Sequence, residues 1–460
     1  MKADQECTFA ELLAVMSKAI TSEKVNPNAI QTARICVLDY LGALFAGLQE
    51  FPAVVVREWV REQSGCPESS ILGYRCKVPA SNAALGNATS SHIVELDDVH
   101  SACMGHPGAV VVSTALAMCE KLGLDGESFL LSIIAGYEVM CRCGIYMGTS
   151  HYKLWHPTCT LGVFGSAATS VKCMRLDMDK ASNAISIAAT MSCGLREAFI
   201  GGSNCKHIHP GLAARNGIIA AQMAEKGFTG PLTAMEGNMG FRRAFQGEGN
   251  DAAREWLPNG RLYIEDTEFK IFASCRSAHT AAEAGIRMHA YADPHLIESI
   301  ELEVPGMIAE DGAWGNLSPE NALAAKLSVP YNFVVSLLDG ECYLEQFSPT
   351  RLEDPTIGVL LSRTKIVPSQ EMDGFYPDYV GVRARIALKN GSVATETVTI
   401  PIGHSLRPLD VSTLHSKFIN LASPIIGENA GRLSDLILNL DNTVKLDEIV
   451  QLCVLPETGG

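Results

Sequence analysis

The feature of this sequence that most constrains its fold is a change of periodicity near Phe269. From Thr8 to about Gly230, apolar residues recur at three- and four-residue steps, which predicts helices almost throughout. The later helices of this run, such as "TLGVFGSAATSVKCM" and "GLAARNGIIAAQMAEKG", consist mainly of small residues. Small side chains let helix backbones approach closely, so we expect a compact helical domain with buried helices.

Beyond Phe269 the pattern indicates strands as well as helices. Residues 299–306 ("SIELEVPG") alternate as in a strand. Residues 382–400 form two alternating segments around Asn390–Gly391, a dipeptide typical of tight hairpins. Between them, residues 320–340 predict a helix that Pro330 must bend or break. We therefore expect a smaller α+β domain over residues 269–404.

Helical periodicity returns in "STLHSKFINLA" and "GRLSDLILNLDN" near the end of the chain. The predicted fold class is mainly α with an α+β second domain, in which residues 1–268 and 405–454 belong to one helical domain. Residues 455–460, "LPETGG", have the form of a sortase recognition sequence without the export and anchoring segments that a natural one needs. We interpret them as an appended tag.

Composition and charge argue against several classes of partner. The net charge of −15 argues against nucleic acid, because phosphate binding needs a basic face, although a local basic pocket would still take a small anion. No apolar stretch of about 18 residues is free of charged residues and histidine, so no membrane partner is expected. The scattered cysteines and the absence of a secretory signal pattern predict a cytoplasmic location, and a mitochondrial one stays open. No dinucleotide fingerprint, Walker motif or HExxH pattern occurs, so neither an organic cofactor nor a metal is expected.

Four stretches concentrate polar side chains within apolar surroundings. Residues 95–110 supply carboxylates and imidazoles, and residues 154–168 place a histidine before a proline. Residues 201–217 hold a lysine and two histidines at a predicted helix start, and residues 269–284 lie at the change of domain. The candidates in these stretches are Glu95, Asp97, Asp98, His100, His106, His156, Lys206, His207, His209, Arg215, Lys270, Cys275, Arg276 and His279.

Each stretch also has a purely structural interpretation. The pair Asp97–Asp98 could cap a helix, and His156 beside a proline could be a buried, hydrogen-bonded structural histidine. Lys206 with its histidine neighbour could be a solvated cation cluster, and Cys275 a small buried residue. As a set, however, imidazoles and a lysine near helix starts form an anion-binding surface. The neighbouring carboxylates and imidazoles add general acids and bases near neutral pH.

Five stretches, in this order along the chain, resemble the signature stretches of the MmgE/PrpD family over roughly residues 8–450: "ELDDVHSACMGHPGAVV", "WHPTCTLGVFGSAA", "CKHIHPGLAARNG", "FKIFASCRSAHTAAEA" and "AKLSVPYNFVVSLLDG". The family includes 2-methylcitrate dehydratase, cis-aconitate decarboxylase and iminodisuccinate epimerase. The resemblance implies a large helical domain built from both chain ends, a smaller α+β lid domain and a site in the cleft between them. It also implies a homodimer and no metal or organic cofactor.

The resemblance further implies which positions form the site. The expected catalytic residues are Asp97, Asp98, His106, His156 and Lys206. The expected substrate-binding residues are Glu95, Lys270, Cys275 and His279 from the resemblance, together with His100 and His209 from the same polar stretches.

Two departures from the family pattern stand out. Glu95 occupies a position where relatives usually have aspartate, which lengthens the reach of that carboxylate. Decarboxylating relatives can also use a tyrosine from the lid segment that matches residues 305–316. This segment has Trp314 and no tyrosine here, so the carry-over of that role fails.

The family's reactions share one physical problem, because negative charge develops beside a carboxylate whether a proton or CO₂ is lost. Cationic donors in a dry cleft can stabilise that charge by roughly 3 kcal/mol each. The sequence therefore predicts a cofactor-independent lyase acting on a small anionic di- or tricarboxylate. Dehydration of a 2-methylcitrate-type substrate stands slightly ahead of cis-aconitate-type decarboxylation. The alternatives are an iminodisuccinate-type epimerase and a non-catalytic carboxylate-binding protein of the same fold.

Overall fold

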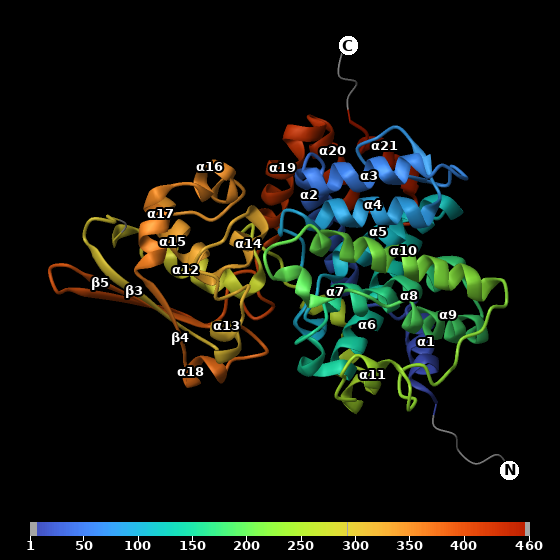
Figure 1. Ribbon diagram of the computed structural model, residues 1–460. Helices are drawn as coiled ribbons and strands as arrows, with labels where there is room; N and C mark the ends of the chain where they lie inside the picture. Colours follow the sequence, from blue (N-terminus) through green and yellow to red (C-terminus); the bar gives the residue numbers. More distant parts are fainter. Residues whose placement is uncertain (1–6, 292, 456–460) are drawn as a thin grey trace.

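The elements of the chain form two lobes that lie side by side, one helical and one with a sheet (Figure 1). The computed structural model describes residues 7–291 and 293–455. The interpretation of residues 455–460 as a tag falls almost entirely outside the described residues. The fold class predicted from the sequence, mainly α with an α+β part, is confirmed.

The helical lobe owes its density to small residues at the crossings of its helices. A side chain at Gly217 would place its Cβ 2.4 Å from the Cβ of Ser166, so this crossing of α10 and α8 requires glycine. The prediction of closely packed, buried helices is confirmed at this crossing. The helices before residue 269 are α1 Phe9–Ala19, α2 Pro27–Gly47, α3 Phe51–Glu62, α4 Ala80–His92, α5 Pro107–Leu122, α6 Gly126–His151, α7 Pro157–Thr160, α8 Gly162–Met174, α9 Met178–Thr190, α10 Cys205–Glu225 and α11 Phe241–Ala244, with the short strands β1 Ser69–Ser70 and β2 Lys77–Val78.

Two helices form the apolar centre of this lobe. Among the described residues, α2 and α6 are the two helices long and apolar enough to cross a membrane by length and composition. Their most apolar windows are 72% and 89% buried inside the protein, which is the burial of core helices. The longer of them, α6, contains one non-helical residue, Gly148 (φ 69°), near its end.

The second lobe is a four-stranded sheet with helices against it. The strand order is β4-β3-β5-β6, in which β3 and β4 are parallel and the other neighbours antiparallel. The predicted hairpin around Asn390–Gly391 is the connection between β5 and β6. The helix expected over residues 320–340 is broken at Ser328, between α14 and α15, and Pro330 lies in the first turn of α15. The elements are α12 His279–Arg287, β3 Ile297–Val304, α13 Gly306–Glu310, α14 Ala322–Leu327, α15 Val329–Asp339, α16 Pro349–Leu352, α17 Pro355–Ser362, β4 Thr364–Pro368, α18 Gln370–Asp373, β5 Val382–Leu388 and β6 Val393–Val398.

The end of the chain returns to the helical lobe. The three last helices are α19 Val411–Ile426, α20 Asn429–Leu438 and α21 Leu446–Leu452. Helix α19 packs along α2, and α20 packs against both α2 and α21. In Figure 1 these red helices lie beside the blue ones, so both chain ends build one lobe.

Candidate active site

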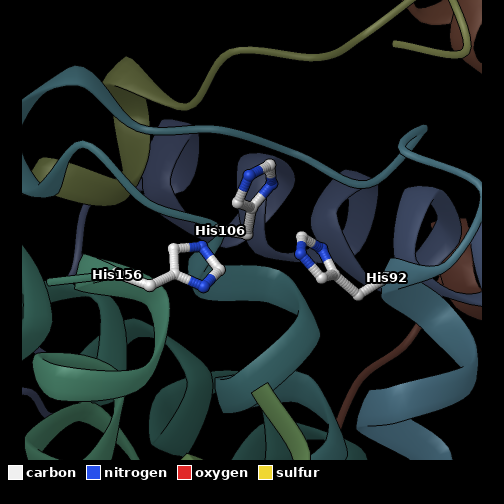
Figure 2. A group of neighbouring side chains, drawn as sticks. All are labelled: His92, His106 and His156. Atoms are coloured by element: carbon white, nitrogen blue, oxygen red, sulfur yellow. The ribbon is translucent and has the colours of Figure 1, made fainter. Parts of the chain in front are cut away.

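Three segments that are far apart in the sequence bring polar side chains to one buried point of the helical lobe. They are the stretch from the end of α4 to the start of α5, the start of α7 and the start of α10. His92 is the last residue of α4, while His106 and His156 are the N-cap residues of α5 and α7. Figure 2 shows these three imidazole rings turned toward a common space.

Two His-Pro dipeptides explain why imidazoles lie at helix starts. Pro107 and Pro157 take first-turn positions of α5 and α7. The fixed φ of proline suits this position, and the N–H that it lacks would have no partner within the helix. The predicted placement of His106 at a helix start, with Pro107 in the first turn, is confirmed.

Asp97 orients two of the three rings. Its Oδ2 lies 2.8 Å from His92 Nδ1 and 3.2 Å from His106 Nδ1. The same nitrogen of His106 lies 2.9 Å from the carbonyl oxygen of Asp98. Because both neighbours are acceptors, His106 Nδ1 carries the proton and Nε2 keeps its lone pair. Although burial raises the pKa of Asp97, its interactions with the two rings hold it well below the ordinary value.

Glu95 joins two buried lysines. One oxygen of its carboxylate contacts Lys206 Nζ, and Oε2 lies 3.1 Å from Lys270 Nζ. Lys206 Nζ also lies 2.9 Å from Nε2 of His92. Glu95 has φ 57°, in the left-handed region that residues with a side chain seldom adopt. A strained backbone conformation of this kind typically occurs at functional sites, and here it accompanies a carboxylate held between two ammonium groups.

Buried charges of both signs balance in this cluster. The side chains of Lys206 and Lys270 are 2% exposed, and those of Glu95 and Asp97 are 0% and 1% exposed. Despite the opposing effect of burial, the two ammonium groups lower the pKa of Glu95, and the two carboxylates raise that of Lys270. Glu95, Asp97 and Lys270 are therefore charged near neutral pH. An anion that enters this balanced site adds a net negative charge, which favours protonation of an imidazole.

Three of the imidazoles, those of His106, His156 and His209, are neutral near pH 7. Burial lowers the pKa of His106 to about 4, and burial with nearby positive charge lowers that of His156 well below its ordinary value. His209 lies behind His156, with 2.9 Å between their Nδ1 atoms, and burial lowers its pKa to about 4. One of these two nitrogens must donate to the other, so the tautomer of His209 sets that of His156.

Three buried lysines from later parts of the chain hold the loop that follows α4. Lys326 Nζ donates to the carbonyl of Val94 at 3.2 Å, and Lys270 Nζ to the carbonyl of Glu95 at 3.3 Å. Lys417 Nζ donates to the carbonyl of Leu96 at 2.6 Å. Three consecutive carbonyl groups are thus bonded by ammonium groups from α14, from the segment before α12 and from α19.

Asp98 lies next to the cluster but faces away from it. Its Oδ1 accepts the backbone N–H of Gly108 at 2.9 Å, and its Oδ2 lies 2.5 Å from the hydroxyl of Tyr137. Burial raises the pKa of Asp98 to about 8, so this carboxyl is mostly protonated at pH 7. The two adjacent aspartates therefore differ in both environment and charge.

Two of the predicted histidines are engaged elsewhere. His100 Nε2 lies 2.7 Å from the carbonyl of Tyr263, and its Nδ1 accepts the backbone N–H of Ala102. His279 Nε2 lies 3.2 Å from the carbonyl of Ser274. Both rings bond to the nearby backbone and do not join the cluster around Glu95.

A small cavity lies beside the cluster, where the two lobes meet. Its walls include His106, Tyr152, Cys275, Arg276, Trp314 and Tyr376. It holds only ≈ 40 Å³, whereas ligand pockets usually measure roughly 300–1,000 Å³. The conformation described here therefore leaves little room beside His106. Among the predicted residues, Cys275 takes its place in this wall rather than in the cluster.

Three residues of this site were not predicted from the sequence: His92, Lys326 and Lys417. His92 stands three residues before Glu95, so its nearness to an acidic motif was a usable signal. The two lysines had none, because they lie in ordinary amphipathic helices 231 and 322 positions after Glu95. Only the packing of the whole chain brings them to the loop.

The three clustered imidazoles are also the group of described residues whose donor atoms come close enough to hold a metal ion, all within 4.8 Å of one another. A metal at this point would need the lone pair of His92 Nε2, which already accepts from Lys206. The ammonium groups of Lys206 and Lys270 would also repel a dication. The donor set therefore fits an anion better than a metal ion, and metal independence remains a prediction.

The chain is similar to known proteins over most of its length. The MmgE/PrpD N-terminal domain matches residues 11–253, and the MmgE/PrpD C-terminal domain matches residues 272–442. A cis-aconitate decarboxylase of Aspergillus terreus is 28% identical over 412 residues, which cover 84% of each chain. The cis-aconitate decarboxylase of Homo sapiens is 27% identical over 457 residues, covering 95% of this chain and 92% of the human one.

A mitochondrial 2-methylcitrate dehydratase of Yarrowia lipolytica is 22% identical over 422 residues, covering 82% of this chain and 77% of that enzyme. Decarboxylases and dehydratases are both lyases, and the two domain matches together span most of the chain. The family resemblance and the enzyme class predicted from the sequence are confirmed. The chain therefore belongs to the MmgE/PrpD family, and it is a lyase.

Proposed function

We propose that this lyase removes CO₂ from a small tricarboxylate of the cis-aconitate type without a metal or organic cofactor. The observation that carries the proposal is the pairing of two buried ammonium groups, Lys206 and Lys270, with neutral imidazoles at helix starts. Such a site can bind a polyanion through opposite charge and hydrogen bonds. It can also transfer a proton, and it is shielded from water.

The lysines supply the electrostatic part of the mechanism. Loss of CO₂ leaves an electron pair on carbon, and conjugation spreads the negative charge onto a neighbouring carboxylate of the substrate. Among the described residues, Lys206 Nζ has two hydrogen-bond partners, Glu95 and His92, so its third N–H is free for that carboxylate. A fixed donor in a desolvated site stabilises developing charge by roughly 3 kcal/mol.

The imidazoles supply the proton. His106 lines the cavity and keeps a lone pair on Nε2, so it takes up a proton from water when the site gains negative charge and then donates it to the substrate carbon that has lost CO₂. Proton transfer of this kind contributes about 10²–10⁴-fold.

Two tyrosines in the cavity wall offer a replacement for the missing lid tyrosine. Tyr152 and Tyr376 line the same cavity as Trp314 and His106. Burial raises the pKa of both phenols, so both stay protonated near pH 7 and can donate. The site therefore contains phenol groups, although Trp314 is the aromatic residue of the lid segment in which decarboxylating relatives can use a tyrosine.

Decarboxylation now stands ahead of dehydration, which reverses the order favoured by the sequence alone. The fungal and human relatives named as cis-aconitate decarboxylases are 27–28% identical to the chain, against 22% for the dehydratase. Dehydration of a 2-methylcitrate-type substrate is the second candidate, since it needs the same stabilised charge. Epimerisation and mere binding remain further alternatives, and we expect a homodimer in the cytoplasm.

The test is a panel of di- and tricarboxylates incubated with the protein and followed by proton NMR. We expect a new alkene signal and release of CO₂ with the cis-aconitate-type substrate. Loss of water from a 2-methylcitrate-type substrate would favour the second candidate, and exchange of a proton with inversion would favour an epimerase. A carboxylate that raises Tm without being turned over would favour a binding protein and refute the proposal.

A further inference from the structure

Two cysteines lie in contact beside the His156 segment. The Sγ atoms of Cys159 and Cys193 are 3.6 Å apart. Cys159 belongs to α7, three residues after His156, and Cys193 lies in the loop that follows α9. Neither thiol has a part in the mechanism proposed above.

Hydrogen bonds hold the two segments together on both sides of the thiols. The N–H of His156 donates to the carbonyl of Gly194 at 2.9 Å, and the hydroxyl of Ser192 donates to the carbonyl of Thr160 at 2.9 Å. Gly194 has φ 115°, and a side chain there would place its Cβ 2.5 Å from the Cβ of Cys159. The backbones therefore approach closely, and a bond between the two sulfurs needs no unfolding.

The two thiols differ in accessibility. Cys159 is buried, whereas Cys193 is partly exposed. The hydrogen bond from Cys159 lowers the pKa of Cys193 to about 7 despite its partial burial. A partly exposed thiol with thiolate character next to a second thiol is the arrangement of a reactive and a resolving cysteine.

The chain contains a matched pair that lacks this exposure. Cys119 and Cys173 also have their Sγ atoms 3.6 Å apart, and both are buried. This pair lies between α5 and α8, away from the His156 segment. Comparing the two pairs therefore distinguishes the effect of the Sγ–Sγ distance, which they share, from the effect of solvent exposure, in which they differ.

We propose that Cys159 and Cys193 form a reversible redox site that is oxidised by hydroperoxides and that, as a disulfide, displaces His156. With hydrogen peroxide, the thiolate of Cys193 attacks one oxygen of the O–O bond and forms a sulfenic acid, and the leaving hydroxide takes up a proton to become water. The thiol of Cys159 then attacks that sulfur, so the S–S bond forms, the S–O bond breaks, and a second water leaves with the Cys159 proton. One peroxide is reduced and two thiols are oxidised, and an excess of a small dithiol reverses the change.

The geometry predicts an effect on turnover. A disulfide is about 2.05 Å long, so the two sulfurs must close by roughly 1.5 Å. Cys159 lies one helical turn after His156, and a shift of about 1 Å in a catalytic group can cost about 10²-fold in rate. This part of the inference rests on the proposed function, because it requires His156 to take part in turnover.

The experiment treats the full chain with hydrogen peroxide, alkylates the remaining free thiols and maps the peptides by mass spectrometry. We expect a cross-link between Cys159 and Cys193, and a loss of turnover of at least about tenfold that dithiothreitol restores. Cys193→Ser and Cys159→Ala should each abolish the cross-link and the loss. Cys119→Ser, the matched control, should leave both unchanged.

Each result decides one part of the inference. Absence of the cross-link, or a faster link between Cys119 and Cys173, would overturn the redox site. A complete cross-link with unchanged turnover would overturn the effect on His156. If untreated protein turns over none of the carboxylates, the proposed function fails, and the peptide map still tests the redox site.

Discussion

The neighbouring residues Asp97 and Asp98 should respond in opposite ways to the same isosteric change. Asp97 is ionised and accepts from the imidazoles of His92 and His106. Asp98 is mostly protonated at pH 7 and is bonded to Gly108 and Tyr137 instead. Replacing each by asparagine keeps the volume and removes the charge only at the first position.

The expected magnitudes follow from these contacts. In Asp97→Asn the amide group cannot accept from both rings as the carboxylate does, so one imidazole loses its partner or changes tautomer. An imidazole left in the wrong tautomer by this exchange can cost about 10⁴-fold in kcat. We expect at least about 10²-fold here, roughly 2.7 kcal/mol. In Asp98→Asn the amide still accepts from Gly108 and can donate to the Tyr137 oxygen, so kcat should stay within about threefold.

The assay measures kcat and KM for both variants at pH 7, together with Tm to confirm folding. Equal losses in the two variants, or a larger loss for Asp98→Asn, would refute the assignment of Asp97 as the residue that orients the imidazoles. A pH series adds a second check. Because the pKa of Asp98 rises from 3.8 to about 8 on folding, its contribution to stability is complete below pH 3.8 and is lost as pH rises through about 8. Asp98→Asn should lack that loss.

His106→Gln should keep its fold and lose at least about tenfold in kcat/KM, roughly 1.4 kcal/mol. His279→Gln, the buried control outside the cluster, should keep its kcat/KM. Similar kcat/KM values in the two variants would show that His106 takes no part in the reaction. Lys206→Ala should lose about 10²–10³-fold in kcat and also Tm, because it leaves Glu95 with one ammonium partner. Adding Glu95→Gln should restore Tm and not turnover, and recovery of turnover would make the lysine structural. Dialysis against a strong chelator should leave activity intact, and a loss that zinc, iron or magnesium reverses would show a metal requirement. Because burial lowers the pKa of His106 and His209 to about 4, the folded state binds fewer protons than the unfolded state between pH 4 and 6.5. Tm should therefore fall as pH is lowered through that window, and a flat profile would contradict the neutral imidazoles.

Local chemistry explains which parts of the fold were predictable from the sequence. The β5–β6 connection and the break just before Pro330 depend on residues within a few positions of each other, and both were predicted. The break has a simple cause, since proline removes a backbone donor and fits the first turn of the helix that follows it. The helices near the end of the chain were predicted from the return of helical periodicity alone.

The site was predictable where a motif and a helix start coincide. His106, His156 and Lys206 were named from polar stretches that match the family's motifs, and the structure places each at the beginning of a helix and brings them together. His100 and His279 belong to the same motifs, but each ring bonds to a backbone carbonyl outside the cluster, the first one distant in the sequence and the second one five residues earlier. A sequence pattern does not reveal which way such a ring turns. The assignment of roles to all these residues remains a prediction.

The attachment of one loop by distant lysines has a consequence for how the protein matures. The carbonyl groups of Val94, Glu95 and Leu96 are held by residues that a ribosome adds much later, the last of them being Lys417. Domains generally fold during synthesis from the N-terminus onward, yet this loop cannot be completed until α19 has left the exit tunnel. A nascent chain stalled before α19 would thus have most of its helices and no finished catalytic centre. The loop therefore reaches its full set of hydrogen bonds only after the residues of α19 have been added to the chain.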